Sequence, residues 1–267
     1  MWFDSHCHLD SENCSVEQRA AVLARARAAG VERLVTVGVG GPAAMREAVA
    51  LSEVRGPATS SEQLEPRIWA TAGIHPHDAE SLDPELERLL RECLARPRVV
   101  ALGEVGLDYH YDHSPRERQR EVFVQMIALA RELRKPLVIH TREAAADTLE
   151  ILTAEGAREV GGIIHCFSED REFARRALEL DFDLSFSGIA TFKSARSIQE
   201  VAAWAPPERI LLETDSPYLS PVPLRGKRCE PAFVVHTAQR LADLRGIALE
   251  QLAELTTANA VRRFRVD

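Results

Sequence analysis

Short apolar runs alternate with amphipathic segments along the whole chain, and this alternation limits the possible folds more than any other feature. The apolar runs predict strands near 1–5, 33–38, 68–74, 98–103, 136–140, 162–166, 182–187 and 209–213. Helix-like stretches lie between them, near 15–29, 42–54, 83–94, 115–134, 144–154, 169–180 and 194–203. Strands that alternate with helices are typical of a parallel sheet covered by helices.

The stretch from Ser114 to Ile139 illustrates how clear the local signals are. Ser114 is a suitable N-cap, Pro115 fits the first helical position, and Glu117 can complete a capping box. Apolar residues then recur at helical spacing until Pro136 stops the helix. A short apolar strand follows at once, so this stretch predicts one helix–strand unit.

Eight strands and seven helices at about 33 residues per unit favour an α/β fold, a closed (β/α)8 TIM barrel that spans residues 1–267 as a single domain. Continuous apolar strands such as Ile210-Leu211-Leu212 indicate a sheet that is buried on both faces. An open doubly wound sheet is the alternative. Two loops stand out, a polar one from Arg55 to Arg67 and one from Tyr218 to Pro231 that is rich in proline and cations.

Charge and cysteine usage exclude several classes of protein. The 33 basic and 41 acidic residues give a net charge of −8, which argues against a globally basic surface that binds nucleic acid. The five cysteines are scattered and never spaced as CxxC, as expected for free thiols in a reducing compartment. The sequence has neither a signal-peptide pattern nor an apolar run of about 18 residues, so we expect a cytoplasmic protein without a membrane span.

Six residues that can bind metals fall at the ends of predicted strands: His6, His8, Glu104, His140, His165 and Asp215. In barrel enzymes the C-terminal ends of the strands carry the active site. His6 and His8 share one face of their strand, whereas Cys7 points away, and we expect Cys7 and Cys166 to face into packing. One such histidine alone is more often a plain hydrogen-bonding group, but six candidates at one rim indicate a metal centre.

Four imidazoles and two carboxylates are too many ligands for one catalytic ion that keeps an open position. They suit two divalent ions, zinc, manganese or magnesium, about 3.5–4 Å apart. Glu104 is the candidate bridge; His6, His8 and Asp215 would complete one site, and His140 and His165 the other. A metal-bridging hydroxide would then be the nucleophile, and Asp215 could accept a proton from it, so Glu104 and Asp215 are the predicted catalytic residues.

Eight segments surround these residues: Phe3–Leu9, Gly73–His77, Gly103–Tyr109, Val138–Arg142, His165–Ser168, Ser187–Lys193, Glu213–Leu219 and Arg225–Arg228. Together they resemble the TatD family of metal-dependent deoxyribonucleases, which belongs to the amidohydrolase-like barrels. The resemblance implies metal-ligand roles for the same six residues and exonuclease-like trimming of DNA ends from the 3′ side. Two positions depart from the family pattern, because Glu169 replaces a glycine and Cys229 replaces an asparagine.

Contacts to substrate are predicted on the same rim. Arg225, Lys227 and Arg228 form a cationic cluster that could clamp phosphate, although a solvated loop is the alternative. His75 and Lys193 could also reach a phosphate, and His77 is a second choice to His75. The remaining histidines are expected to be solvent-exposed (His110, His113) or structural (His236). No base-stacking aromatic can be assigned, since Trp69 and Tyr109 would be guesses.

The sequence therefore predicts a monomeric, metal-dependent hydrolase that cleaves phosphodiester bonds of DNA, on single-stranded or frayed ends. The first alternative is an amidohydrolase-type enzyme that cleaves a C–N or ester bond of a small molecule or an aminoacyl ester. Residues 98–106 contain no lysine to bridge metals as in many such enzymes. The second alternative, a non-catalytic barrel, would be expected to lack a ligand. The glycines of 38–43 loosely fit a dinucleotide pattern but more simply make a turn.

Overall fold

Eight parallel strands form one sheet, and neighbours in the sequence are neighbours in the sheet. The structure is a computed structural model that describes residues 1–54 and 65–267. The strands are β1 (Trp2–Cys7), β2 (Val31–Gly38), β3 (Arg67–Ala72), β4 (Val99–Asp108), β5 (Leu137–Arg142), β6 (Gly162–Ile164), β7 (Phe182–Phe186) and β8 (Ile210–Leu212). Most of the predicted loop from Arg55 to Arg67 lies outside the described residues.

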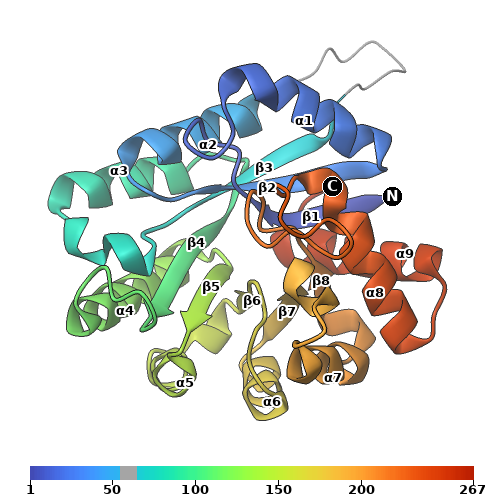
Figure 1. Ribbon diagram of the computed structural model, residues 1–267. Coiled ribbons are helices and arrows are strands. Elements are labelled where there is room, and N and C mark those ends of the chain that lie inside the picture. Colours follow the sequence, from blue (N-terminus) through green and yellow to red (C-terminus); the bar gives the residue numbers. More distant parts are fainter. Residues whose placement is uncertain (55–64) are drawn as a thin grey trace.

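Helices surround this sheet (Figure 1). They are α1 (Val16–Ala28), α2 (Pro42–Glu53), α3 (Pro84–Leu94), α4 (Arg116–Leu133), α5 (Ala145–Ala154), α6 (Arg171–Glu179), α7 (Arg196–Trp204), α8 (Val234–Arg245) and α9 (Leu249–Phe264). The predicted (β/α)8 barrel is confirmed and the doubly wound alternative is wrong. Helices α8 and α9 lie beyond the last helix-like stretch predicted from the sequence, near 194–203. In the described ranges, no helix has the length and apolar character needed to cross a bilayer.

The barrel closes where the segment after β8 meets β1. Cys7 and Ser216 form a parallel bridge. The amide of His8 donates to the carbonyl oxygen of Ser216 at 2.8 Å, and the amide of Asp215 donates to that of His6 at 3.0 Å. These backbone bonds hold three predicted metal ligands from opposite ends of the chain beside one another.

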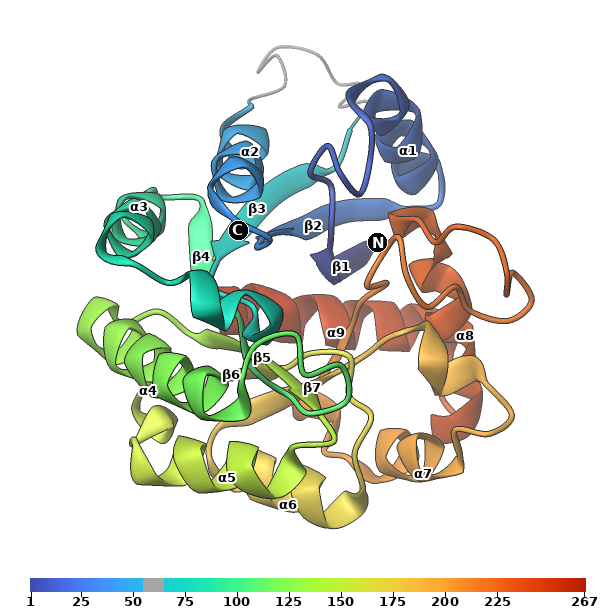
Figure 2. The same ribbon diagram turned by 60° about the vertical axis from the view of Figure 1, so that its left-hand side comes forward.

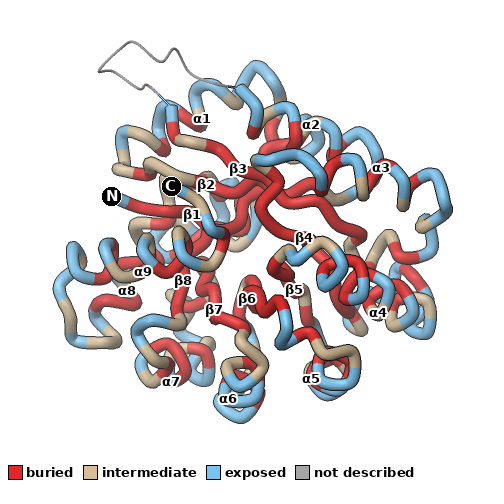
Figure 3. Tube along the Cα trace, turned by 180° about the vertical axis from the view of Figure 1, so that it is seen from behind, coloured by how far each residue is buried: buried red, intermediate tan, exposed pale blue. Residues whose placement is uncertain are grey.

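Apolar residues fill both sides of the sheet, as the continuous apolar strands predict. One cluster lies outside the barrel, between the strands and the helices. A second joins inward-facing strand residues to α9 and contains Phe3, Val35, Trp69, Val100, Ala101, Val138, Ile163, Leu211, Ala260 and Phe264. Figure 2 shows α9 lying across the barrel, and Figure 3 shows that the strands are buried while the helices expose their outer sides. Each buried large side chain contributes about 1.5–3 kcal/mol to stability.

A network of arginines neutralises buried acid at the N-terminal end of the barrel. Asp183, at the start of β7, is fully buried. Its carboxylate accepts from Arg263 Nε at 2.8 Å, from Arg262 at 3.2 Å and from Arg209. Asp181 pairs with Arg209 and Arg263, each at 3.0 Å. This network ties α9 to the strand starts and leaves the buried carboxylate fully compensated.

The predicted capping box at the start of α4 is wrong. The helix begins at Arg116, and no side chain of residues 1–54 or 65–267 caps it with a hydrogen bond. Ser114 Oγ instead donates to the carbonyl oxygen of His77 at 2.8 Å and accepts from the amide of Glu80 at 3.1 Å. The Ser114 hydroxyl is therefore engaged in a tertiary contact. Sequence spacing does not reveal such a contact.

Candidate metal centre

The six predicted ligands meet at the C-terminal ends of the strands, and each is buried or half-buried. His6 lies in β1 and His8 follows it, Glu104 and His140 lie in β4 and β5, and His165 and Asp215 follow β6 and β8. Parallel strands of a closed barrel bring their C-terminal ends to one rim. The structure thus brings together all six residues that the sequence selected.

Glu104 lies at the centre of the group. Its Oε1 is 2.8 Å from His140 Nδ1 and 2.8 Å from His165 Nε2. Its Oε2 is 3.4 Å from His6 Nε2. The two oxygens of one carboxylate therefore face different imidazoles, which is what a ligand shared between two cations requires.

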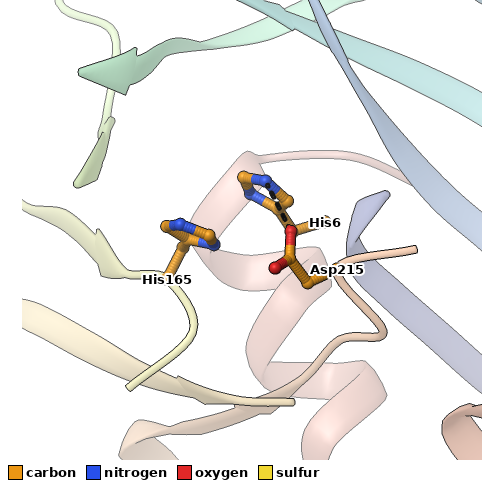
Figure 4. A group of neighbouring side chains, drawn as sticks. All are labelled: His6, His165 and Asp215. Carbon is orange, nitrogen blue, oxygen red and sulfur yellow. Dashed lines mark ion pairs between the residues drawn. The ribbon is translucent and has the colours of Figure 1, made fainter. Parts of the chain in front are cut away.

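Asp215 faces His6 from another side. Its Oδ1 lies 3.7 Å from His6 Nε2 and 3.5 Å from His8 Nε2. The rings of His6 and His165 stack with their centroids 4.0 Å apart and an interplanar angle of 15°. Figure 4 shows the two imidazoles beside the Asp215 carboxylate. His6 is thus flanked by both acids of the centre.

Three sets of side chains place potential ligand atoms within 4.8 Å of one another: His6 with His165 and Asp215, His6 with His8 and Glu104, and His75 with Glu104 and His140. His6 and Glu104 each belong to two sets. His75, predicted as a substrate contact, belongs to the third.

The two ring nitrogens of His6, which lack hydrogen bonds, indicate whether these residues suit a metal. Both are buried, and neither makes a hydrogen bond in the part of the chain that the structure describes. A buried polar atom without a partner costs about 1–3 kcal/mol, and a cation that takes the lone pair removes that cost. Burial lowers the pKa of His6, which keeps it in the neutral form that binds metals. Imidazole nitrogens beside carboxylate oxygens are a donor set for divalent transition metals.

The pKa values of the acids agree with this interpretation. Burial raises the pKa of Glu104, but the surrounding imidazoles, led by His165, outweigh it and hold that pKa well below its usual range. Burial also opposes ionisation of Asp215, yet a hydrogen bond from His8 keeps its pKa lowered. The pKa of His165 is raised despite burial, because Glu104 and Glu213 lie beside it. The centre therefore holds ionised carboxylates whose nearest partners are imidazoles.

Strand β4 is longer than predicted, which changes how Glu104 is placed. The predicted strand ends at residue 103, whereas β4 continues to Asp108. Glu104 therefore lies inside the strand and not at its end. Pairing with β5 shifts register between Gly103 and Val105, so Glu104 is the extra residue of a β-bulge. Bulges beside active sites re-aim a side chain, and periodicity alone does not reveal them.

Gly106 lets β5 approach β4 closely. Its φ is 141°, and a Cβ at this position would lie 2.0 Å from the carbonyl oxygen of His140. A residue with a side chain would push the two strands apart. The glycine therefore helps to set the separation of Glu104 and His140.

Asp108 is a site residue that the sequence interpretation missed. Its Oδ2 accepts from His140 Nε2 at 3.1 Å and from His77 Nε2 at 3.0 Å. Its Oδ1 accepts from the amides of His110 and Tyr111 at 3.0 and 2.9 Å. With a proton on Nε2, Nδ1 of His140 would be the nitrogen that binds a cation beside Glu104 Oε1, which lies 2.8 Å away. A longer β4 would have revealed Asp108, because strand residues two apart share a face.

His75 is arranged in the opposite way to His140. Its Nδ1 accepts from the amide of His77 at 3.1 Å, so the neutral ring carries its proton on Nε2. Burial is the main reason that its pKa falls to about 4. Nε2 lies 3.4 Å from Glu104 Oε1. At neutral pH, His75 therefore offers a hydrogen-bond donor to the centre, and ligation through Nε2 would require the loss of the bond from His77.

Glu213 is a second missed residue. It is fully buried, its Oε1 accepts from the amide of Cys166 at 2.6 Å, and the same oxygen lies 3.3 Å from His165 Nδ1. It thereby orients the His165 ring from behind. The sequence feature that could have identified Glu213 is its position two residues before Asp215.

The two cysteines beside the ligands behave differently. Cys7 is buried and its Sγ lies 3.4 Å from the carbonyl oxygen of Val35, away from the centre as predicted. Cys166 is only half-buried, and its Sγ lies 3.2 Å from Ser187 Oγ. Cys166 was expected to face into packing; its Sγ contacts the hydroxyl of Ser187, and the residue keeps partial exposure.

The predicted cationic cluster is exposed on the loop that begins at Asp215. Arg225, Lys227 and Arg228 form no ion pair with a carboxylate within residues 1–54 and 65–267. Arg228 donates to the main-chain oxygen of Asn13 and so leaves its charge uncompensated. These groups are available to an anion that approaches the rim.

The loop also contacts the segment after β7, where Lys193 is exposed. The amide of Val222 donates to Thr191 Oγ1 at 2.9 Å. The Arg225 guanidinium lies 4.1 Å from the centroid of the Phe192 ring, and Lys193 is the next residue. The structure therefore brings the segment of Lys193 to the cationic loop.

The remaining sequence predictions concern two histidines, a glycine turn and two aromatic residues. His110 and His113 are exposed as expected, and the glycines at 40 and 41 form the turn into α2 with positive φ angles. Trp69, which the sequence could not assign as a stacking platform, is buried against Phe3 and has no face for a base. Tyr109 is half-buried, and its hydroxyl donates to Asp147 at 2.7 Å.

The family model described as TatD related DNase matches residues 3–265. The chain belongs to this family. A relative from Bacillus subtilis, named as the metal-dependent hydrolase YabD, is 42% identical over the full length of both chains. A relative from Rahnella, named as a 3′-5′ ssDNA/RNA exonuclease TatD, is 32% identical and covers 93% of this chain and 92% of its own. The crystal structure of the Escherichia coli TatD homologue YJJV superposes with a TM-score of 0.88 at 26% identity and covers 100% of this chain and 98% of its own.

This TatD-family protein is accordingly a metal-dependent hydrolase. The two departures from the TatD pattern lie outside the ligand sets. Cys229 is buried, with its Sγ 3.9 Å from the carbonyl oxygen of Thr214, and Glu169 is half-buried. Neither side chain takes part in the contacts around Glu104 and Asp215.

Proposed function

We propose that this hydrolase cleaves phosphodiester bonds of DNA at single-stranded or frayed ends. The observation that supports this most directly is Glu104, whose oxygens face separate sets of imidazoles. A carboxylate shared in this way suits a pair of cations, the arrangement of many enzymes that hydrolyse phosphate esters. The family description and the name of the Rahnella relative support the same substrate class.

In this proposal two divalent ions are held by His6, His8 and Asp215 on one side, by His140 and His165 on the other, and by Glu104 between them. When bound, such ions stabilise charge on phosphoryl oxygens and lower the pKa of water toward about 7. Among the described residues, His6 argues most strongly for cations, since its buried nitrogens make no hydrogen bond and the nearest acids to Nε2 are the proposed ligands Glu104 and Asp215.

Asp215 is the proposed general base. Its lowered pKa keeps it ionised at neutral pH, so it can accept a proton from the attacking water. Its Oδ1 faces His6 and His8, which leaves Oδ2 to take that proton. Asp108 and Glu213 act through the imidazoles they orient, and so are positioning residues.

Substrate would be held by two kinds of donor. The Nε2–H of His75 can donate to a phosphoryl oxygen or to the leaving oxygen at the centre. Arg225, Lys227, Arg228 and Lys193 would bind the phosphates beyond the cleaved bond, because charge-assisted bonds from uncompensated cations are strong. Local positive charge of this kind lets a protein of net charge −8 accept a polyanion.

The test is hydrolysis of end-labelled single- and double-stranded DNA by the metal-stripped protein reloaded with zinc, manganese or magnesium. A parallel panel contains small cyclic amides, lactones and aminoacyl esters. We expect metal-dependent shortening of single strands from the 3′ end and much slower action on blunt duplexes. Turnover of an amide or ester without any DNA cleavage would overturn the proposal in favour of a small-molecule hydrolase.

A further inference from the structure

Two tyrosines are exposed at the mouth of the barrel. Tyr111 is 50% exposed and Tyr218 is 52% exposed. Among the described residues they are the only phenylalanine, tyrosine or tryptophan side chains in the exposed class. Tyr111 follows the end of β4 and Tyr218 follows β8. Because β4 and β8 are four strands apart in an eight-stranded barrel, the two rings lie on opposite sides of the mouth.

The ring of Tyr111 is held against the Asp108 side of the metal centre. Its amide donates to Asp108, the acid that orients His140. Its ring meets the edge of His77 at a centroid distance of 5.5 Å and an angle of 87°. The Arg142 guanidinium lies 4.7 Å from the ring centroid. A ring that packs against these groups and is still half-exposed has a surface left for a ligand.

The ring of Tyr218 is held against the Asp215 side. Its hydroxyl donates to Asn13 Oδ1 at 3.0 Å, and its amide donates to the carbonyl oxygen of Asp215 at 2.9 Å. The ring meets the edge of His8 at a centroid distance of 5.8 Å and an angle of 78°. The residue is therefore anchored through its hydroxyl and its backbone amide, while about half of its surface faces solvent.

We propose that Tyr111 and Tyr218 are base-stacking platforms that hold a single strand across the metal centre. The inference rests on the proposed function and extends it to how the strand is recognised. An aromatic face accepts any base, but only a base that has left its duplex partner. The platforms would select unpaired strands irrespective of sequence, while Arg142 and the cationic loop contact the backbone.

The experiment compares two substrates of equal length. One is a single-stranded oligonucleotide with normal bases, and the other carries abasic residues on the same phosphodiester backbone. The wild-type enzyme should have a higher kcat/KM for the strand with bases. Tyr111→Ala and Tyr218→Ala should each lower that kcat/KM about 5- to 150-fold, mainly through KM, and should affect the abasic strand far less. Replacement of either tyrosine by tryptophan should preserve the preference for bases.

Val222→Ala is the matched control, because Val222 is 45% exposed on the same loop as Tyr218. It should leave both rates unchanged, and thermal melts should show that all variants fold. A double tyrosine variant that still prefers the strand with bases overturns the inference, as does one in which both substrates lose activity equally. If the wild-type enzyme cleaves neither strand, the proposed function fails; calorimetric binding of the two strands to wild type and double variant then decides the inference separately.

Discussion

The two ends of this barrel both bury carboxylates, but they neutralise them differently. At the N-terminal end, Asp183 is surrounded by the guanidinium groups of Arg209, Arg262 and Arg263. At the C-terminal end, Glu104 and Asp215 have only imidazoles as partners within the described ranges. Arginine is always charged, whereas an imidazole is cationic only after it gains a proton.

This difference separates a structural end from a reactive end. The charges at the N-terminal end are complete without any added group, so changes there should act on folding. The carboxylates at the C-terminal end have no permanently charged partner within the described ranges. His6 also has buried nitrogens with no hydrogen bond in the described structure. Changes there should act on metal binding and turnover and leave the fold intact.

The largest expected effect is on turnover. Asp215→Asn removes the proposed base and one metal ligand, so kcat should fall about 10²–10⁴-fold. The variant should still fold, since replacing this acid leaves the barrel packing unchanged. DNA hydrolysis after metal stripping and reloading measures the first effect, and thermal unfolding measures the second. Near-normal hydrolysis by this variant would show that another group takes the proton.

The second-largest expected effect is on the free energy of unfolding and concerns the N-terminal end of the barrel. Asp183→Asn removes the buried carboxylate that three arginines share and leaves Arg209 and Arg263 with Asp181 alone, so the free energy of unfolding should fall by about 3–5 kcal/mol. Urea denaturation measures it. Asp112→Asn removes an exposed acid that pairs with Arg116, the first residue of α4, and should cost less than about 1 kcal/mol. Equal losses in the two variants would mean that burial of the network contributes little.

A smaller expected effect, on metal affinity, shows whether Asp108 positions the ligand His140. Asp108→Asn frees the His140 ring to change its tautomer, so metal affinity should weaken about 10- to 100-fold. Titration calorimetry measures this change, and nitrogen NMR of the imidazoles reports the tautomer directly. Asp147→Asn is the control, because Asp147 bonds Tyr109 and Arg120 and contacts none of the metal candidates. Unchanged affinity in Asp108→Asn would assign Asp108 to local structure alone.

The smallest effect is a pH dependence at the N-terminal end. Burial opposes ionisation of Asp181, but its hydrogen bond from Arg263 lowers its pKa below the unfolded value. An acid with a lowered pKa stabilises the fold above its unfolded pKa of about 4, and this contribution is lost as pH falls through the folded pKa. Since Asp181 is about half exposed, Asp181→Asn should cost at most about 1 kcal/mol at pH 7 and less at pH 3. Urea titrations at both pH values test this; a difference that grows on acidification would contradict it.

Much of the architecture could be predicted from the sequence because its signals are local. The order of apolar runs gives the strands, and strand ends give the rim where His6, His140 and His165 meet. Features that depend on tertiary contacts were missed. The bulge at Glu104 and the extension of β4 to Asp108 depend on pairing with β5, and periodicity does not register such pairing.

The aromatic platforms show the same limit. Trp69 lies within the predicted strand near 68–74 and Tyr111 lies beyond the predicted strand near 98–103, but neither position shows which ring has a free face. Trp69 packs inside the barrel against Phe3, whereas Tyr111 is exposed beside His77. Exposure is a property of the assembled fold, so the sequence could not assign it.

The central claim is that residues from opposite ends of the chain share a pair of cations at the C-terminal end of the barrel. Anomalous diffraction from crystals grown with excess manganese tests it most directly. The account predicts two peaks at this rim, with Glu104 contacting both and His6 and Asp215 contacting one. Peaks that are absent from this rim, or bound by other groups while these side chains point apart, would contradict it.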